Sequence, residues 1–134
     1  MTVEQDLERL LGKDCRTKVI LTRKAVADIE ALDRGLQSIV VAAIVRRARG
    51  GPLLKPRGLG EPLGRGLAGV AAKIKLKRHG MRIVYRPVER GDAIVMEILA
   101  VGPRDAGEVY REVARRLNEI DKDAAGASAR EPPK

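Results

Sequence analysis

The chain has 134 residues, which suits one domain, and 44% of them are hydrophobic, enough for one modest core. That core must be aliphatic, because the sequence holds two Tyr and neither Phe nor Trp. The single cysteine excludes a domain held together by internal disulfides and fits a cytoplasmic protein. No apolar run approaches the roughly 18–20 residues of a membrane span, which predicts a protein away from the membrane, and the net charge of +9 makes it strongly basic.

The first half of the chain predicts a short helix, a strand and two further helices. Residues 1–14 carry an amphipathic pattern and predict a short helix. Residues 15–21 are rich in β-formers and predict a strand. Thr22 is the expected N-cap of the next helix, and the apolar spacing over residues 36–44 predicts another. The tight break between these two helices indicates an antiparallel pair.

The second half predicts a loop, three strands and a helix. Residues 50–69 hold seven Gly and three Pro and predict a basic loop. Asp105 and Glu108 have the spacing of a capping box and open a final helix that ends at Ile120. The three strands, joined by tight turns as an antiparallel meander, are predicted at residues 71–77, 82–87 and 93–101.

Together these elements predict a single α+β domain over residues 15–120. The order is a strand, two helices, three antiparallel strands and a helix, for which a small sheet with helices packed on one face is the simplest architecture. Residues 1–14 form an N-terminal extension in this scheme. Residues 121–134, rich in Asp, Lys, Ala, Ser and Pro, predict a disordered tail.

The positive charge is concentrated in the middle third of the sequence. Residues 46–90 carry 13 basic and two acidic side chains, a net charge of +11, whereas residues 1–45 are neutral and residues 91–134 have a net charge of −2. A localised basic surface is typical of proteins that bind polyanions, above all nucleic acids. A merely solubilising surface would not explain the neutral and acidic flanks.

Alternation along the predicted strands collects cations on one face of the sheet. Lys73, Lys75 and Lys77 share one face of the first strand, and Arg82 and Arg86 share one face of the next. Like charges on paired strands repel each other, and an anionic partner would offset that cost. A lysine row that protects a strand edge from aggregation is the alternative, but it explains the lysines and not the arginines.

These basic strands belong to a longer pattern, which runs Lys73-Ile74-Lys75-Leu76-Lys77, Gly80, Arg82-Ile83-Val84-Tyr85-Arg86, Val101-Gly102-Pro103-Arg104 and Glu108-Val109-Tyr110. The five pieces, in this order and at these intervals, closely resemble the RelE toxins of toxin–antitoxin modules. The resemblance covers residues 63–118 well, covers residues 15–50 only as a compatible order of elements, and does not reach the first 14 residues or the tail. It implies a RelE-like fold and ribosome-dependent cleavage of messenger RNA.

The resemblance also implies five catalytic residues. Lys73 and Lys75 match the two catalytic lysines of the family, and Arg82 matches its transition-state arginine. Arg104 matches the arginine at the end of the last strand, and Tyr110 matches the tyrosine of the C-terminal helix. The implied reaction is attack of the RNA's own 2′-OH on the neighbouring phosphate, without a metal or cofactor.

Lysine and arginine can supply this chemistry. A lysine among other cations has its charged form disfavoured, so Lys75, between Lys73 and Lys77, is the expected base. Arg82 stays protonated and suits stabilisation of the phosphate. Arg104 would protonate the leaving 5′-oxygen, the role that the resemblance favours, or hold the phosphate. Tyr110 would stack on a base or orient the nucleotide, with core packing as its alternative. Tyr85, on the opposite strand face, is expected in the core.

Further RNA contacts are expected from basic residues beside this set. His79 is the only histidine in the chain and lies in a predicted turn, where it could act as acid or base near neutral pH. A lone histidine in a turn is more often simply exposed, and the resemblance does not require one here. One Cys, one His and no spaced carboxylate cluster predict no metal site. The expected RNA-binding residues are Lys77, Arg78, His79 and Arg86.

Two other functions remain open. A ParE-like inhibitor of DNA gyrase would share the fold, although relatives of that kind generally lack the complete set of lysine, arginine and tyrosine. A catalytically inactive nucleic-acid-binding module would bind without cleaving. For the favoured ribonuclease, the resemblance implies messenger RNA, the ribosome and a cognate antitoxin protein as partners.

Overall fold

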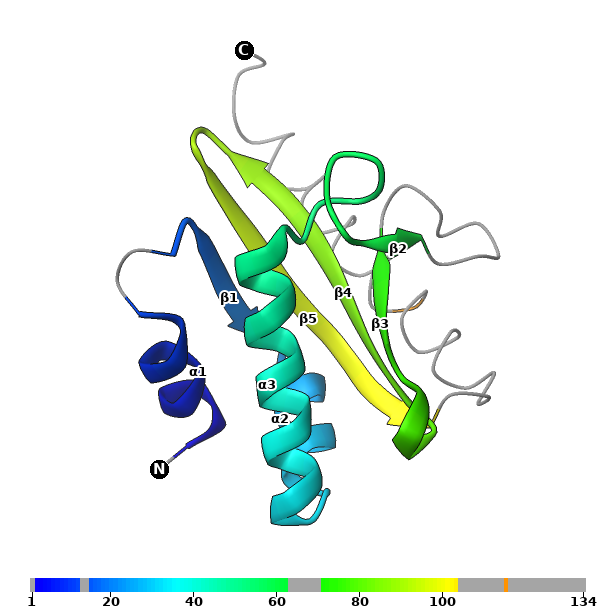
Figure 1. Cartoon of the computed structure of the whole chain (residues 1–134). Helices are drawn as coiled ribbons and strands as arrows, with labels where there is room; N and C mark the ends of the chain where they lie inside the picture. The colour runs from blue at the N-terminus through cyan, green and yellow to red at the C-terminus, as the bar shows by residue number, and fades with distance from the viewer. Residues whose placement is uncertain (1, 13–14, 63–70, 104–114, 116–134) are drawn as a thin grey trace.

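The computed structural model describes residues 2–12, 15–62, 71–103 and 115, and the fold is given for these residues (Figure 1). Five strands form one sheet in the order β1-β5-β4-β3-β2. The pair β1–β5 is parallel, and the other pairs are antiparallel. The elements in chain order are α1 (Val3–Leu11), β1 (Thr17–Leu21), α2 (Arg23–Glu30), α3 (Arg34–Gly50), β2 (Glu61–Pro62), β3 (Ala72–Leu76), the 3₁₀ helix η1 (Lys77–His79), β4 (Met81–Arg90) and β5 (Ala93–Pro103).

The predicted α+β class is confirmed, with one strand more than expected. β2 lies inside the segment that predicted only a loop, where it pairs with the edge of β3. The predicted helix of residues 105–120, apart from residue 115, and the predicted tail lie outside the described residues. None of the helices that the structure describes is long and apolar enough to cross a membrane.

Side-chain caps fix where the described helices begin. Thr2 forms a capping box with Gln5 at the start of α1. Thr22 caps α2 as expected, accepting a hydrogen bond from the Ala25 amide, and its hydroxyl also donates to the Ile98 carbonyl of β5 at 2.9 Å. Thr22 therefore both starts α2 and fastens it to β5.

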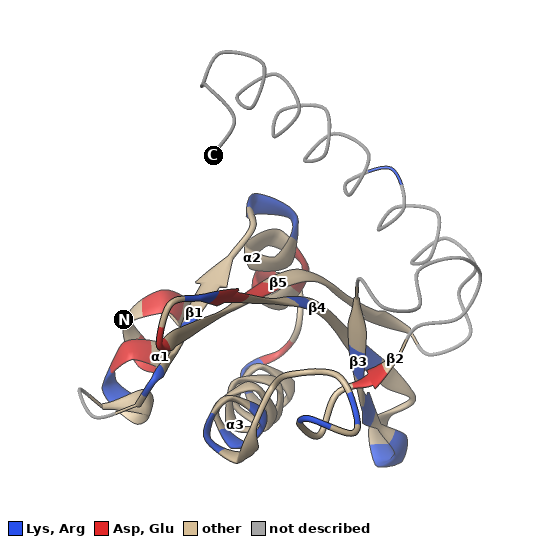
Figure 2. Ribbon diagram, turned by 90° about the horizontal axis from the view of Figure 1, so that it is seen from above, with Lys and Arg blue, Asp and Glu red and all other residues tan. Residues whose placement is uncertain are grey.

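The core lies between α3 and the sheet, which Figure 2 shows from above. Its side chains are aliphatic apart from Tyr85, which is fully buried, as predicted. The Tyr85 hydroxyl donates to the Pro52 carbonyl at 2.8 Å and accepts from Arg47 Nη1 at 3.2 Å. Arg47 also donates to the Lys73 carbonyl at 3.3 Å. Through these bonds Tyr85 ties α3 and the following loop to β4, and Arg47 ties α3 to β3.

Candidate nucleic-acid interface

The register of β3 and β4 brings three of the predicted catalytic residues together. Lys75 lies directly opposite Arg82, and Lys73 lies opposite Val84. Residues that face each other in an antiparallel pair share one side of the sheet. The buried pair Ile74 and Ile83 belongs to the core on the other side. Lys73, Lys75 and Arg82 therefore form one face, as expected, and all three side chains are partly exposed.

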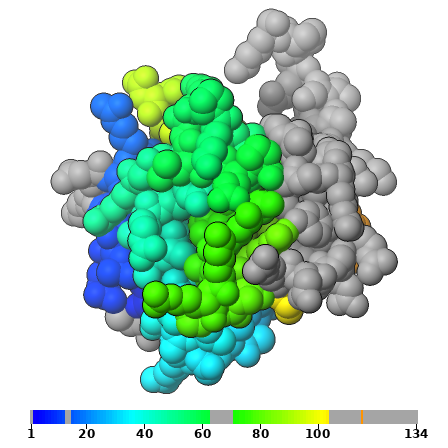
Figure 3. All heavy atoms as spheres, turned by 45° about the vertical axis from the view of Figure 1, so that its right-hand side comes forward, coloured from blue at the N-terminus to red at the C-terminus, as the bar shows by residue number. Residues whose placement is uncertain are grey.

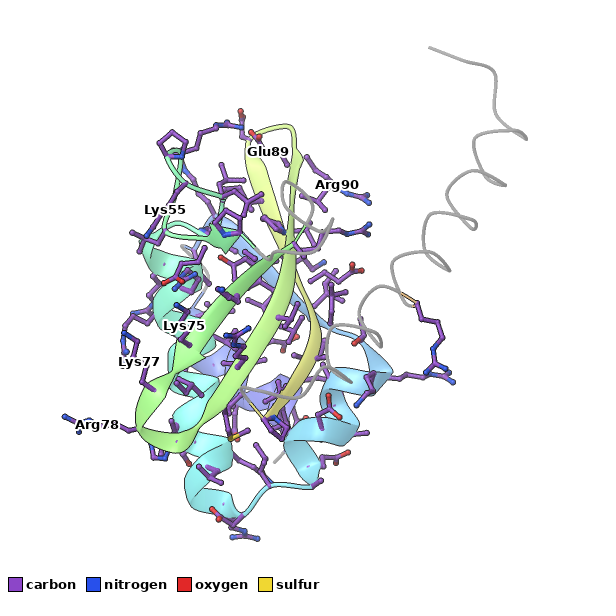
Figure 4. All side chains as sticks on the ribbon, turned by 90° about the vertical axis from the view of Figure 1, so that its right-hand side faces the viewer. Lys55, Lys75, Lys77, Arg78, Glu89 and Arg90 are labelled. Atoms are coloured by element: carbon purple, nitrogen blue, oxygen red, sulfur yellow. The ribbon has the colours of Figure 1, made fainter. Side chains whose placement is uncertain are left out.

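Lys77 does not continue this row on the strand, so that part of the prediction is wrong. β3 ends at Leu76, and the chain turns through η1 to Gly80, whose φ of 61° lies in the left-handed region that favours glycine. The exposed side chains of Lys77, Arg78 and His79 therefore project from the turn. Figure 4 shows Arg78 extending away from the body of the molecule.

A carboxylate that the sequence did not point to lies among the lysines. Glu61 of β2 pairs with Lys73 in the strand register, and its Oε2 is 3.3 Å from Nζ of Lys75. The sequence predicted that only cations surround Lys75. The structure instead places the carboxylate of Glu61 beside this lysine. Glu61 is one of two acidic residues in the segment 46–90, a sign that could have drawn attention to it.

The lysines change the ionisation of Glu61. Partial burial by itself would raise the pKa of this carboxyl group, but a hydrogen bond from Lys75 and the charges of Lys75, Lys55 and Lys73 outweigh it. The net effect holds the pKa below the ordinary value of 4.5, so Glu61 is an anion at neutral pH. The ion pair offsets part of the repulsion within the row of lysines.

A second carboxylate pairs with Arg86, one of the predicted RNA-binding residues. Glu97 of β5 lies directly opposite Arg86, with 3.1 Å between Oε1 and Nη2. Both side chains are about four-fifths buried, with exposed fractions of 21% and 22%. RNA would have to compete with Glu97 for this guanidinium, whereas the cations of the β3–β4 turn have no such competitor in the part of the chain described here.

Two predicted catalytic residues lie outside the described residues: Arg104 and Tyr110. The strand that leads to Arg104 is described, and its end, Pro103, pairs with Met81 at the start of β4. Among the described residues no group of three or more His, Cys, Asp or Glu side chains could hold a metal ion. The described face is thus an arrangement of lysine, arginine and glutamate, and its ordinary partner would be a phosphate.

A five-stranded mixed sheet with a cationic face on β3 and β4 makes this chain a small α+β protein. No family model matches the sequence. Over 45 residues the chain is 38% identical to the mRNA interferase toxin RelE of Escherichia coli (strain K12), a stretch that makes up 34% of this chain and 45% of the relative. The chain thus matches less than half the length of that curated relative.

Solved structures extend the likeness in fold to about two thirds to three quarters of the chain. A mutant of E. coli toxin RelE in the free state aligns with a TM-score of 0.57 at 23% identity, over 75% of this chain and 96% of that chain. The same mutant bound to an antitoxin RelBc peptide aligns with a TM-score of 0.51 at 23% identity, over 72% of this chain and 93% of that chain. The YoeB/ParE toxin from Agrobacterium tumefaciens aligns with a TM-score of 0.50 at 23% identity, over 64% of this chain and 97% of that chain. The predicted resemblance to the RelE/ParE toxins is confirmed, and the fold is that of RelE.

Proposed function

We propose that the chain is the toxin of a type II toxin–antitoxin system, a metal-independent endoribonuclease that cleaves messenger RNA on the ribosome. The observation that carries this proposal is the joint placement of Lys73, Lys75 and Arg82 on one face of β3 and β4. The local identity to an mRNA interferase toxin supports the activity. A cytoplasmic place of action and the ribosome as partner belong to the same proposal.

The reaction needs one proton acceptor, one proton donor and positive charge at the phosphate. Lys75, as the neutral amine after it has parted from Glu61, takes the proton of the 2′-OH, whose oxygen then attacks the adjacent phosphorus. Arg82 stabilises the charge that develops on the pentacoordinate phosphate, helped by Lys73. Arg104 gives a proton to the 5′-oxygen as the phosphorus–oxygen bond breaks. The products are a 2′,3′-cyclic phosphate and a 5′-hydroxyl end, and Tyr110 orients the nucleotide.

Glu61 has to part from Lys75 when substrate binds. The two side chains are about one-third exposed, at 32% for Lys75 and 35% for Glu61, so water can replace each partner at a small cost. The incoming phosphate is then the anion beside the lysines. Active-site contacts of a substrate-free enzyme commonly rearrange in the reactive complex.

A cognate antitoxin is the second proposed partner. A similar solved structure is a RelE mutant in complex with an antitoxin peptide. The net charge of +9 favours a partner segment that is acidic or amphipathic.

The deciding experiment is induced expression of the wild-type chain and of Lys75→Ala in a bacterial host, with growth and new messenger RNA 5′ ends followed over minutes. Lys18→Ala is the matched control, because Lys18 is an exposed lysine on β1, at the other edge of the sheet. We expect the wild type and Lys18→Ala to stop growth and to create codon-phased ends, and Lys75→Ala to reduce cleavage by about 10²–10⁴-fold.

Two outcomes would contradict the ribonuclease function. Arrested growth with intact messages and damaged DNA would favour a ParE-like gyrase inhibitor on the same fold. No effect on growth or messages from the wild-type chain would leave a nucleic-acid-binding module without catalysis.

A further inference from the structure

The loop between α3 and β2 is folded tightly upon itself. The Leu59 amide donates to the Gly51 carbonyl at 2.8 Å, and the Gly60 amide donates to the Leu53 carbonyl at 2.9 Å. The Lys55 amide donates to the Gly60 carbonyl at 3.0 Å. These bonds join the beginning of the loop to its end, so residues 51–60 form a compact unit.

Two glycines show how closely this loop is packed. A Cβ atom at Gly58 would lie 2.4 Å from the Leu53 carbonyl oxygen, and one at Gly60 would lie 2.9 Å from the Tyr85 hydroxyl. The same hydroxyl donates to the Pro52 carbonyl. The loop is thus fixed to the buried tyrosine, and it presents its own side chains in a defined place beside β3.

The loop carries two cations with different surroundings. Arg57 forms a bidentate ion pair with Glu89 of β4, with 3.0 Å between Nη2 and Oε2. Lys55 is exposed, and its charge helps to lower the pKa of Glu61, an effect that burial of Glu61 opposes. In the part of the chain that the structure describes, the Lys55 ammonium group has neither a hydrogen bond nor an ion pair. It is therefore available to an external anion.

Lys55 lies in line with the cations of β3 and of the turn after it. Figure 4 shows Lys55, Lys75, Lys77 and Arg78 following one another along one side of the molecule. In Figure 3 the loop, β3 and the turn form a continuous green surface beside α3. A single row of cations suits a single phosphate backbone better than the two backbones of a duplex.

We propose that Lys55 is a further phosphate-binding residue, and that single-stranded RNA lies along this side of the molecule from Lys55 to the β3–β4 turn. Nucleotides that flank the cleaved phosphate would then contact Lys55 at one end and Lys77 and Arg78 at the other. This inference rests on the proposed function and deepens it, because it extends the substrate beyond the cleaved nucleotides.

The test measures the dissociation constant of a fluorescent single-stranded RNA that is 2′-O-methylated throughout and so cannot be cleaved by its own 2′-oxygens. We expect Lys55→Ala to weaken binding several-fold and to reduce the slope of log affinity against log salt by about 0.7. Lys18→Ala, the control at the other sheet edge, should bind like the wild type. Shortening the RNA from one end should abolish the difference between Lys55→Ala and the wild type.

Three results would overturn the inference: equal affinities for wild type and Lys55→Ala, equal losses for Lys55→Ala and Lys18→Ala, or tighter binding of duplex than of single-stranded RNA. A wild-type chain that does not bind the modified RNA would overturn it as well. Cleavage is measured separately on unmodified messenger RNA bound to the ribosome, where the proposed nuclease acts. Binding through Lys55 without cleavage would refute the nuclease and leave the binding residue standing, and cleavage without a Lys55 effect would do the opposite.

Discussion

Lys75 and Glu61 form the ion pair at the centre of the candidate site. Their side chains are 32% and 35% exposed, and surface pairs of this kind add at most about 1 kcal/mol to stability. The larger effect of the ion pair is that it reduces the positive charge of this face of the sheet. Lys73, Lys75, Arg82 and Arg86 share that face with two carboxylates, Glu61 and Glu97, within the residues that the structure describes.

The state of Glu61 predicts a pH dependence of stability. Its pKa is lowered by Lys75, Lys55 and Lys73 against the raising effect of burial, so the folded protein holds the anion more firmly than the unfolded chain does. The resulting stability is complete above the ordinary pKa of 4.5 and is lost as the pH falls through the lower folded value. We expect the wild type to have a higher free energy of unfolding than Glu61→Gln, and to lose this difference only below about pH 4.5. Urea unfolding at a series of pH values measures it. If the free energies of unfolding of the wild type and Glu61→Gln fell in parallel as the pH was lowered, the prediction would be contradicted.

The sequence was sufficient to group Lys73, Lys75 and Arg82, because side chains alternate along a strand whatever its neighbours are. It was not sufficient to find Glu61. β2 has two residues and lies in a segment rich in Gly and Pro, so no local periodicity marks it as a strand. Only its pairing with β3, a contact between distant residues, brings the carboxylate to the lysines.

One buried hydroxyl, that of Tyr85, holds the start of the loop of residues 51–60. Tyr85 joins the Pro52 carbonyl to Arg47. Replacing Tyr85 with Phe removes both hydrogen bonds and leaves a carbonyl oxygen without its donor. We expect Tyr85→Phe to lower the free energy of unfolding by about 1–3 kcal/mol, with an unchanged denaturant dependence. Chemical denaturation at neutral pH measures this change.

Ser38→Ala is the control for the loss of a hydroxyl, because Ser38 is exposed on α3, and it should change stability by less than about 0.5 kcal/mol.

Burial raises the pKa of Tyr85, and Arg47 only partly opposes this. The wild type should therefore lose stability as the pH rises above 10, the ordinary tyrosine value, and Tyr85→Phe should lose less. Equal stability of Tyr85→Phe and wild type at neutral pH would show that the hydroxyl does not hold the loop.

Strand ends were harder to predict than strand positions. The sequence ended the middle strand of the meander at Pro87, a residue that ordinarily interrupts a sheet, whereas β4 continues to Arg90. The reason is topological. Among the residues that the structure describes, β3 pairs with β4 only as far as Tyr85, opposite Ala72. Where Pro87 pairs with Met96, β4 therefore has a partner on one side alone within the described sheet, and the missing N–H is tolerated.

Carboxylates pair with some of the cations that segment 46–90 contributes to the molecule. The segment 46–90 has a net charge of +11, but its strands fold so that Arg86 meets Glu97 and Lys75 meets Glu61. Figure 2 shows Lys and Arg gathered on β3 and the turn that follows it, with the acidic residue of β2, Glu61, beside them. The fold therefore tolerates a basic face without a bound anion, while leaving an excess of positive charge along one side.

That excess predicts a strong salt dependence of RNA binding. If phosphates contact Lys55, Lys73, Lys75, Arg82, Lys77 and Arg78, each contact contributes about 0.7 to the slope of log affinity against log salt for a single strand, giving roughly −4. Affinity for the 2′-O-methylated RNA should then fall about 300-fold between 50 and 200 mM salt, because counterions released on binding are harder to release at higher concentration. Fluorescence titration at four salt concentrations measures the slope, and circular dichroism confirms that the fold is unchanged. A slope near zero would mean that this face does not bind a phosphate backbone, since no other interaction with RNA disperses counterions to that extent.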